Sequence, residues 1–164
     1  MRDLRMFDKF ATRIANPIYL RLFLIAKLPS AYFSGVRVKF ANENMCMVTV
    51  PFKWFSKNPF KSTYFACLAM AAEMSTGVLA MGHTYKKDPK ISMLVRKIEG
   101  NFFKKATGRT TFTCEDGKRI ESAVRETIAS GKSVLINTYS TGKDKDGETI
   151  AEFVVAWSFK AKTT

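Results

Sequence analysis

The stretch from Thr63 to Gly82, TYFACLAMAAEMSTGVLAMG, decides the architecture of this chain. Alanine, leucine and methionine dominate it, and all three residue types favour helix. Apolar side chains occupy every face of its first three turns, which is typical of a helix that is buried nearly all round. We therefore predict a long central helix with Ser62 or Thr63 as its N-cap and His83 as a residue that caps its end.

Strand patterns surround this helix. Residues 36–40 alternate apolar and basic side chains, and a second apolar run at 45–52 follows a polar turn, so we expect a hairpin. A short helix over 118–129 interrupts the later strands, which we expect at 91–103, 110–114, 133–139 and 150–159. The order predicts a single α+β domain over residues 35–164, with a curved antiparallel sheet around the helix.

The first 34 residues form a different kind of segment. Asn16 and Pro17 indicate an N-cap and a first-turn proline, and we expect Ile18, Leu22 and Ile25 on the apolar face of the helix that follows. The apolar run 18–28 is too short to span a bilayer, so no transmembrane segment is predicted. We expect a helical arm over 1–34 that packs on the domain, with contact to a membrane surface as the alternative.

Composition narrows the function classes. The 164 residues carry a formal net charge of +13, which favours an anionic partner. Three cysteines without CxxC spacing and a single histidine give neither a disulfide framework nor a metal site. We expect a protein of the cytoplasm that needs no cofactor. Nucleic acid is not an expected partner, because no compact basic motif appears.

Glu73 lies in the middle of the apolar helix. No basic residue stands one helical turn away, so a local ion pair is not available. An unpaired carboxylate in apolar surroundings is costly, and its pKa rises. Glu73 is therefore a candidate general base or nucleophile facing a cleft. A salt bridge to a basic residue from elsewhere, or a solvent-facing edge, is the structural alternative.

The start of the helix offers a second element. The backbone N–H groups near Tyr64, Phe65 and Ala66 have no partners within the helix and carry partial positive charge. They can polarise an acyl carbonyl, as an oxyanion hole does. Phe65 precedes Glu73 by a little over two turns, which puts one group at the helix mouth and the other deeper.

Here the sequence resembles a known family. Asn58 and the run from Tyr64 to Glu73 resemble the signature of the hotdog acyl-CoA thioesterases, in which an Asn or Gln precedes His-Gly-Gly at the helix start and an Ala-acid pair follows. Tyr64-Phe65-Ala66 fall on His-Gly-Gly, and Ala72-Glu73 on the Ala-acid pair. The resemblance covers about 36–159 and is closest to an uncharacterised, thioesterase-like branch.

The resemblance implies a hotdog fold and a homodimer whose two subunits share the cleft. Two such dimers can pair as a tetramer. It implies that Glu73 attacks the thioester or activates water, that the Phe65 N–H polarises the carbonyl, and that Asn58 places the carbonyl or water. The substrate is an acyl-CoA-type small molecule. Residues expected to line the substrate site are Tyr64, Ala66, Met70, Thr76 and Gly77. Those expected near the coenzyme A phosphates are Lys104, Lys105 and Arg109, or alternatively Lys57 and Lys61 beside the cleft.

Two departures from the family pattern keep other functions open. Phe65 and Ala66 stand where glycines allow close approach of substrate, and Gly77 stands where the family often has Ser or Thr. The second hypothesis is a non-catalytic module that binds an acyl chain or acyl-CoA. The third is a structural dimer whose cleft is filled by side chains. The sequence leaves the acyl group, and coenzyme A versus acyl carrier protein, undetermined.

Overall fold

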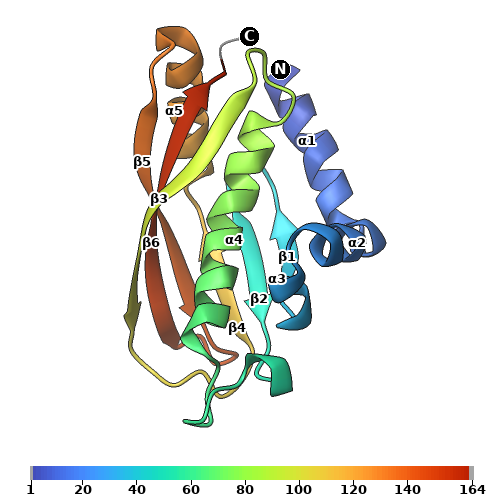
Figure 1. Ribbon diagram of the computed structural model, residues 1–164, viewed down its shortest axis with the longest axis vertical. Coiled ribbons are helices and arrows are strands. Elements are labelled where there is room, and N and C mark those ends of the chain that lie inside the picture. The colour runs from blue at the N-terminus through green and yellow to red at the C-terminus, as the bar shows by residue number, and fades with distance from the viewer. Residues whose placement is uncertain (1, 163–164) are drawn as a thin grey trace.

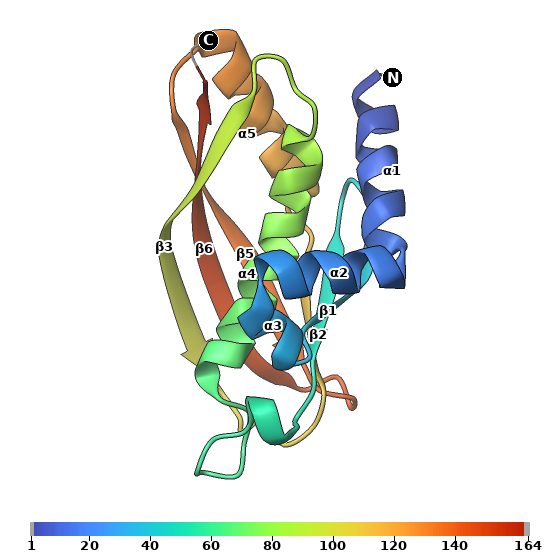
Figure 2. The same cartoon turned by 45° about the vertical axis from the view of Figure 1, so that its right-hand side comes forward.

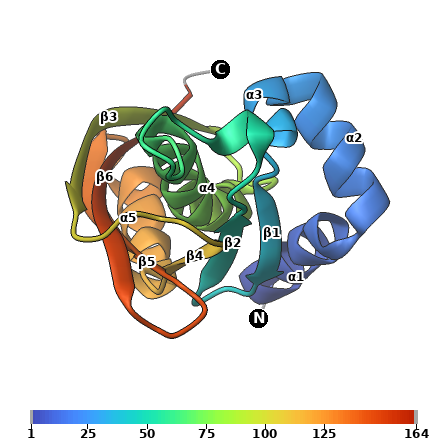
Figure 3. The ribbon, with the colours of Figure 1, turned by 90° about the horizontal axis from the view of Figure 1, so that it is seen from below.

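The computed structural model describes residues 2–162, which form one antiparallel sheet curled around a long helix (Figure 1). The six strands have the order β1-β2-β4-β5-β6-β3. The sheet wraps around helix α4 (Phe65–Thr84), as the view along the helix shows (Figure 3). This is the hotdog arrangement, and it confirms the predicted α+β class. The strands are β1 (Arg37–Ala41), β2 (Cys46–Val50), β3 (Ile91–Phe102), β4 (Thr110–Cys114), β5 (Val134–Lys143) and β6 (Thr149–Ala161).

Helix α4 is buried because small and apolar side chains surround it. Ala71, Ala72, Leu79 and Ala80 are completely buried, and the small alanines let the strands approach the helix closely. Judged by length and composition alone, α4 could cross a membrane, but two thirds of it is buried inside the domain. Its role in this fold is that of a core helix.

Both predicted caps of α4 are wrong. Tyr64 occupies the N-cap position without a side-chain hydrogen bond, because the Thr63 hydroxyl instead donates to the carbonyl oxygen of Ala106 at 3.1 Å. At the other end, His83 is a buried residue inside the helix. Its Nε2 lies 2.9 Å from the Glu43 carbonyl oxygen and its ring packs on Phe7, so tertiary contacts hold it there.

The strands follow the alternation of the sequence. Phe153, Val155, Trp157 and Phe159 of β6 all face the core and are buried. The hairpin of β1 and β2 is present, but a bulge between Val38 and Phe40 changes the register. As a result, Phe40 is 46% exposed and does not join Val38 on the inner face, contrary to the strict alternation.

The two edges of the sheet differ. Helix α1 (Arg2–Ala15) packs beside β1, whereas β3 pairs only with β6 and its other edge has no strand beside it in the described chain. Helix α5 (Gly117–Ser130) lies between β4 and β5 in sequence and packs on α4, as an insertion in the strand order. The long edge of β3 is thus the main unpaired backbone of the fold.

The N-terminal residues form a helical arm, as expected. After α1 come α2 (Pro17–Lys27) and α3 (Pro29–Phe33), and α2 crosses in front of α4 (Figure 2). The Asn16 side chain accepts hydrogen bonds from the amides of Ile18 and Tyr19, which confirms the predicted cap. However, the buried face of α2 carries Leu20 and Leu24, and the face expected to pack on the domain points outward.

Candidate active site

Glu73 has the environment that its sequence position predicts. Its side chain makes no hydrogen bond or ion pair with any residue in 6–162. Burial raises the pKa of the carboxyl group above its ordinary value, because the charged form loses contact with water. The salt-bridge alternative is therefore absent from the described part of the chain. A partly buried, unpaired carboxylate with increased basicity suits proton abstraction.

Glu73 opens into an apolar cavity of about 70 Å³ between α4 and the arm. Leu20, Leu24 and Leu28 of the arm form one wall, and Met74 and Val78 of α4 form another. Among the described residues that line this cavity, Glu73 alone is charged. The helical arm is thus part of the cavity wall. The sequence pattern does not predict this role, because it depends on how α2 packs against α4.

The turn of α4 that follows Glu73 is tightly packed. A Cβ placed on Gly77 would lie 3.1 Å from Glu73 Oε1 and 3.3 Å from Cζ2 of Trp157, so glycine leaves room for the carboxyl group. Thr76 is fully buried; its hydroxyl donates to the Glu73 carbonyl and accepts from Trp157 Nε1. The threonine hydroxyl is therefore already engaged, while Gly77 borders the carboxylate directly.

The helix mouth is open and has free donors. The amides of Phe65 and Ala66 make no hydrogen bond within the described residues, whereas the next amide, of Cys67, donates to the Tyr64 carbonyl. The rings of Phe65 and Tyr64 are about half exposed and meet edge to face at 4.8 Å. Two N–H groups at a helix N-terminus can bind a carbonyl oxygen that gains negative charge.

Asn58 organises the loop before the helix. Its side-chain oxygen accepts hydrogen bonds from the amides of Phe60 and Ser62 and from the Ser62 hydroxyl. Its amide nitrogen lies 3.5 Å from the Thr63 carbonyl oxygen, at the limit of a hydrogen bond. The Asn58 side-chain oxygen already accepts three hydrogen bonds, so only the amide nitrogen can contact a ligand.

A hollow of about 580 Å³ lies at the helix mouth. It brings together Asn58, Tyr64 and Phe65 with Lys104 and Lys105, which follow β3. Lys105 Nζ lies 3.4 Å from the Phe60 carbonyl oxygen. Phe102 and Phe103 add apolar surface to the same hollow, so it offers both cationic and aromatic contacts to a ligand.

The remaining basic candidate is placed nearby. Arg109 shares a hollow of about 220 Å³ with Lys104 and Lys105. Lys104 forms ion pairs with Glu148 and, at 3.6 Å, with Asp144, so part of its charge is already balanced. Lys105 and Arg109 are therefore the better-placed groups for a phosphate.

Glu73 and the helix mouth are too far apart to act on one carbonyl within a single chain. Eight residues of α-helix span about 12 Å along the axis. The cavity at Glu73 and the hollow at the mouth also share no lining residue. Met70 and Ala66 lie on the partly exposed side of α4 between the two groups. One protomer thus holds a partly buried carboxylate and a pair of free helix amides that it cannot bring together itself.

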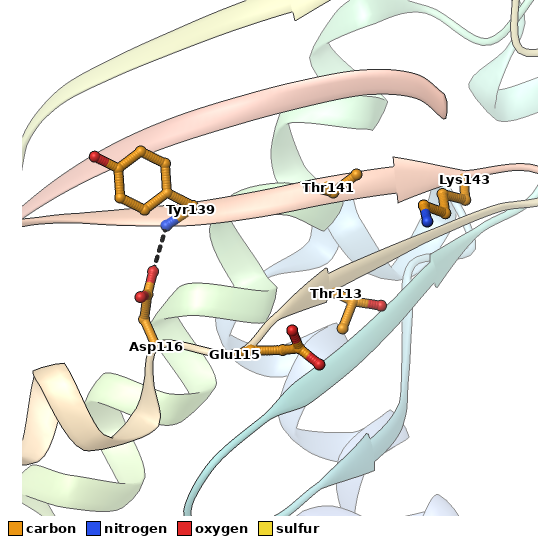
Figure 4. Close-up of a pocket in the computed structure, with 6 residues that line it drawn as sticks. All are labelled: Thr113, Glu115, Asp116, Tyr139, Thr141 and Lys143. Carbon is orange, nitrogen blue, oxygen red and sulfur yellow. Dashed lines mark hydrogen bonds between the residues drawn. The ribbon is translucent and has the colours of Figure 1, made fainter. Parts of the chain in front are cut away.

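A further hollow, of about 450 Å³, lies on the strands β4 and β5, away from Glu73 and the helix mouth (Figure 4). Its acidic residues are Glu115 and Asp116, and Asp116 accepts hydrogen bonds from the Tyr139 amide and from Arg119. No group of three His, Cys, Asp or Glu that could hold a metal ion occurs among the described residues. This hollow therefore does not extend the site.

Comparison with known proteins identifies the family. A family model described as "Domain of unknown function (DUF4442)" matches residues 20–158. The chain belongs to the DUF4442 family. The matched region begins within α2, so it includes part of the arm as well as the hotdog domain. No curated protein matches this DUF4442 chain.

Solved structures share the fold of this DUF4442 protein. A Pseudomonas aeruginosa protein of unknown function, described as a probable thioesterase, is 20% identical, with a TM-score of 0.75 over 89% of this chain and 97% of its own. A Chlorobaculum tepidum protein of unknown function is 13% identical, with a TM-score of 0.77 over 99% and 100%. A thioesterase from Haemophilus influenzae is 11% identical, with a TM-score of 0.63 over 85% and 88%.

Proposed function

We propose that this DUF4442 protein hydrolyses an acyl-CoA thioester. The observation that carries the proposal is Glu73, an unpaired and partly buried carboxylate with a raised pKa beside an apolar cavity. The descriptions of the Pseudomonas and Haemophilus proteins as thioesterases agree with it. The acyl group lies against the apolar wall, and the coenzyme A phosphates lie near Lys105 and Arg109.

In this mechanism Glu73 takes a proton from water, and the hydroxide forms a bond to the thioester carbonyl carbon. The oxyanion is held by the amides of Phe65 and Ala66. The C–S bond then breaks, and the proton passes from Glu73 to the thiolate, which gives the carboxylic acid and coenzyme A. Direct attack by the Glu73 carboxylate, followed by hydrolysis of the anhydride, is the variant in which Glu73 is the nucleophile.

The proposal includes a homodimer, because the two halves of the site are about 12 Å apart in one chain. We infer that the helix mouth of one protomer meets Glu73 of its partner. The open edge of β3 supports this pairing: it is twelve residues long, and Ile98 and Phe102 on its inner side are about half exposed. An unpaired edge strand is a template for a second chain. Further pairing of dimers into a tetramer remains part of the proposal.

The test is thiol release from acyl-CoA esters, from acetyl to palmitoyl and aromatic acyl groups, with wild type compared to Glu73→Gln. We expect release with wild type and almost none with the variant. Binding of coenzyme A esters without release by wild type at any chain length would select the non-catalytic module instead. Phe65 favours that second candidate, because its half-exposed ring stands at the mouth where glycine would give substrate free approach.

A mixing experiment tests the shared site. Phe65→Pro removes the amide hydrogen at the first position of α4, which proline tolerates, and Tyr64 before it has the extended backbone that proline requires. Glu73→Gln and Phe65→Pro are each expected to lose nearly all of their activity. Unfolded and refolded together, they form mixed dimers with one intact site, so about a quarter of wild-type activity returns. No recovery would show that each site is built within one chain.

The cysteines support a reducing compartment, and we propose the cytoplasm. Cys46 and Cys114 face each other across β2 and β4 as free, buried thiols. Burial raises the pKa of Cys114 to about 12 and that of Cys46 further, so neither thiol ionises readily. No part of the mechanism uses them.

A further inference from the structure

Helix α2 is apolar on two opposite faces, although it lies on the surface of the molecule. Leu20 and Leu24 pack inward over the Glu73 cavity. Ile18, Leu22 and Ile25 point outward and are 72%, 64% and 45% exposed. A helix that is apolar all round is normally covered on all sides. The outer face of α2, defined by these three residues, therefore lacks a partner within the described chain.

An aromatic cluster extends this surface. Phe33 ends α3, and Trp54 and Phe55 lie in the short 3-10 helix η1 (Trp54–Ser56). The ring of Phe55 is 5.7 Å from that of Phe33 and 4.8 Å from that of Trp54. All three rings are more than half exposed. Helix α2 packs on α3, which ends at Phe33, so the aromatic cluster continues from the end of the arm.

The charged residues beside the outer face of α2 and the aromatic cluster are all basic. In the segments that carry the outer face of α2 and the aromatic cluster, residues 17–33 and 53–57, every charged residue is basic. Arg21 and Lys27 lie on α2, and Lys53 and Lys57 flank the aromatic cluster. All four are exposed and have no ion pair with a described residue. Positive charge around aliphatic and aromatic side chains matches the interface of an anionic lipid bilayer.

We propose that this protein docks on anionic membrane surfaces through the outer face of α2 and the aromatic cluster. A second copy of the chain is the poorer occupant, because a symmetric contact here would bring two unbalanced positive surfaces together. The face also lies away from the open edge of β3, so the inferred dimer leaves it accessible (Figure 3). The inner side of α2 lines the Glu73 cavity, so docking brings that cavity close to the lipid.

Vesicle co-sedimentation tests the proposal with the full chain. We expect binding to phosphatidylcholine vesicles that contain about 30% phosphatidylserine, an anionic surface. Binding is at least ten times weaker on pure phosphatidylcholine and in about 0.5 M salt, where the charges are screened. Failure of the wild type to bind the anionic vesicles overturns the proposal.

Paired variants locate the surface. Ile18→Ser combined with Leu22→Ser removes two side chains that are mostly exposed, and we expect at least tenfold weaker binding to anionic vesicles. Leu135→Ser is the matched control, since Leu135 is also about 60% exposed but lies on β5, on the outer face of the sheet. Unchanged binding in the double variant, or equal loss in the control, overturns the assigned surface.

Tryptophan emission gives a direct readout. Trp54 is 72% exposed in the cluster, and Trp157 is buried under the sheet. We expect anionic vesicles to shift the emission of wild type to shorter wavelength and to leave that of Trp54→Phe unchanged. A protein that binds single-stranded nucleic acid but no vesicle, or whose α2 variants change its oligomeric state without any vesicle binding, has a different partner on this face, and the proposal fails.

This proposal and the proposed hydrolysis fail independently. Glu73→Gln is expected to bind anionic vesicles as wild type does, since its side chain is inside the cavity. The Ile18→Ser and Leu22→Ser double variant is expected to hydrolyse a short, soluble acyl-CoA at the wild-type rate. Loss of both properties in either variant would indicate misfolding, which circular dichroism and the thermal transition distinguish.

Discussion

The mouth of α4 and its middle offer opposite environments to a thioester. At the mouth, two amides without partners lie in an open hollow beside lysines and aromatic rings. In the middle, Glu73 has only apolar side chains around it and the arm over it. The mouth can stabilise negative charge, and the middle makes a carboxylate basic. Each supplies what the other lacks, and the proposed site, assembled from two copies of α4, would combine the two.

The largest expected effect removes the base. Glu73→Gln keeps the size and most of the shape of the side chain and loses the acid. We expect kcat/KM for acyl-CoA hydrolysis to fall by about 10³-fold, within the range for a general base. Thiol release measured in the steady state gives the value. Unchanged turnover would remove Glu73 from the mechanism and leave the middle of α4 as packing alone.

The next effect separates the amide at the mouth from the ring beside it. Phe65→Pro removes the N–H, and we expect kcat to fall by about 10²-fold, as for the loss of one oxyanion donor. Phe65→Ala is the matched control, because it removes the exposed ring and keeps the N–H. We expect it to keep kcat or increase it. Equal loss in both variants would assign the effect to the ring.

The pH dependence tests the middle of α4. Glu73 acts as a base only when ionised, and burial raises its pKa. We expect kcat/KM to fall about tenfold per pH unit below that raised pKa, with a midpoint above the ordinary glutamate value of about 4.3. A pH profile measured with one acyl-CoA gives the midpoint. A midpoint at or below the ordinary value would mean that Glu73 is solvated during turnover.

A smaller effect concerns binding at the mouth. Lys105→Ala removes a solvent-exposed cation from the hollow, and surface charges contribute up to about 1 kcal/mol. We expect KM for acyl-CoA to rise by about threefold to fivefold with kcat unchanged, and the rise to shrink at high salt. Lys132→Ala, an exposed lysine beyond α5, serves as the control and should leave KM unchanged.

The smallest effect is on stability. Burial raises the pKa of Glu73 in the folded state. At a pH above the ordinary glutamate pKa, the ionised carboxylate therefore lowers the free energy of unfolding, and at a pH below it this loss disappears. Glu73→Gln avoids this cost, which for a buried polar group is about 1 kcal/mol. We expect its Tm to exceed that of wild type by about 2–4 °C at pH 8 and to equal it near pH 4. A lower Tm at pH 8 would mean that the carboxylate has a favourable partner.

The sequence by itself determined the central helix, the order of strands around it and Glu73 as the exceptional residue. These follow from local periodicity and from a charge without a neighbour one turn away, which a single chain displays directly. The cap at Asn16 is equally local, and the structure confirms it. The resemblance carried by Asn58 and 64–73 then pointed to the hotdog fold.

Only the tertiary structure decided which apolar face of α2 is buried, that the arm walls the Glu73 cavity, and that Thr76 is bound to Trp157. The helix has apolar residues on both faces, so its pattern fits two orientations, and docking against α4 selects one. The sequence likewise predicts His83 as a helix cap, whereas in the structure its ring contacts the Glu43 carbonyl and Phe7. Such contacts join residues far apart in sequence, and their geometry is set by packing, which local periodicity does not encode.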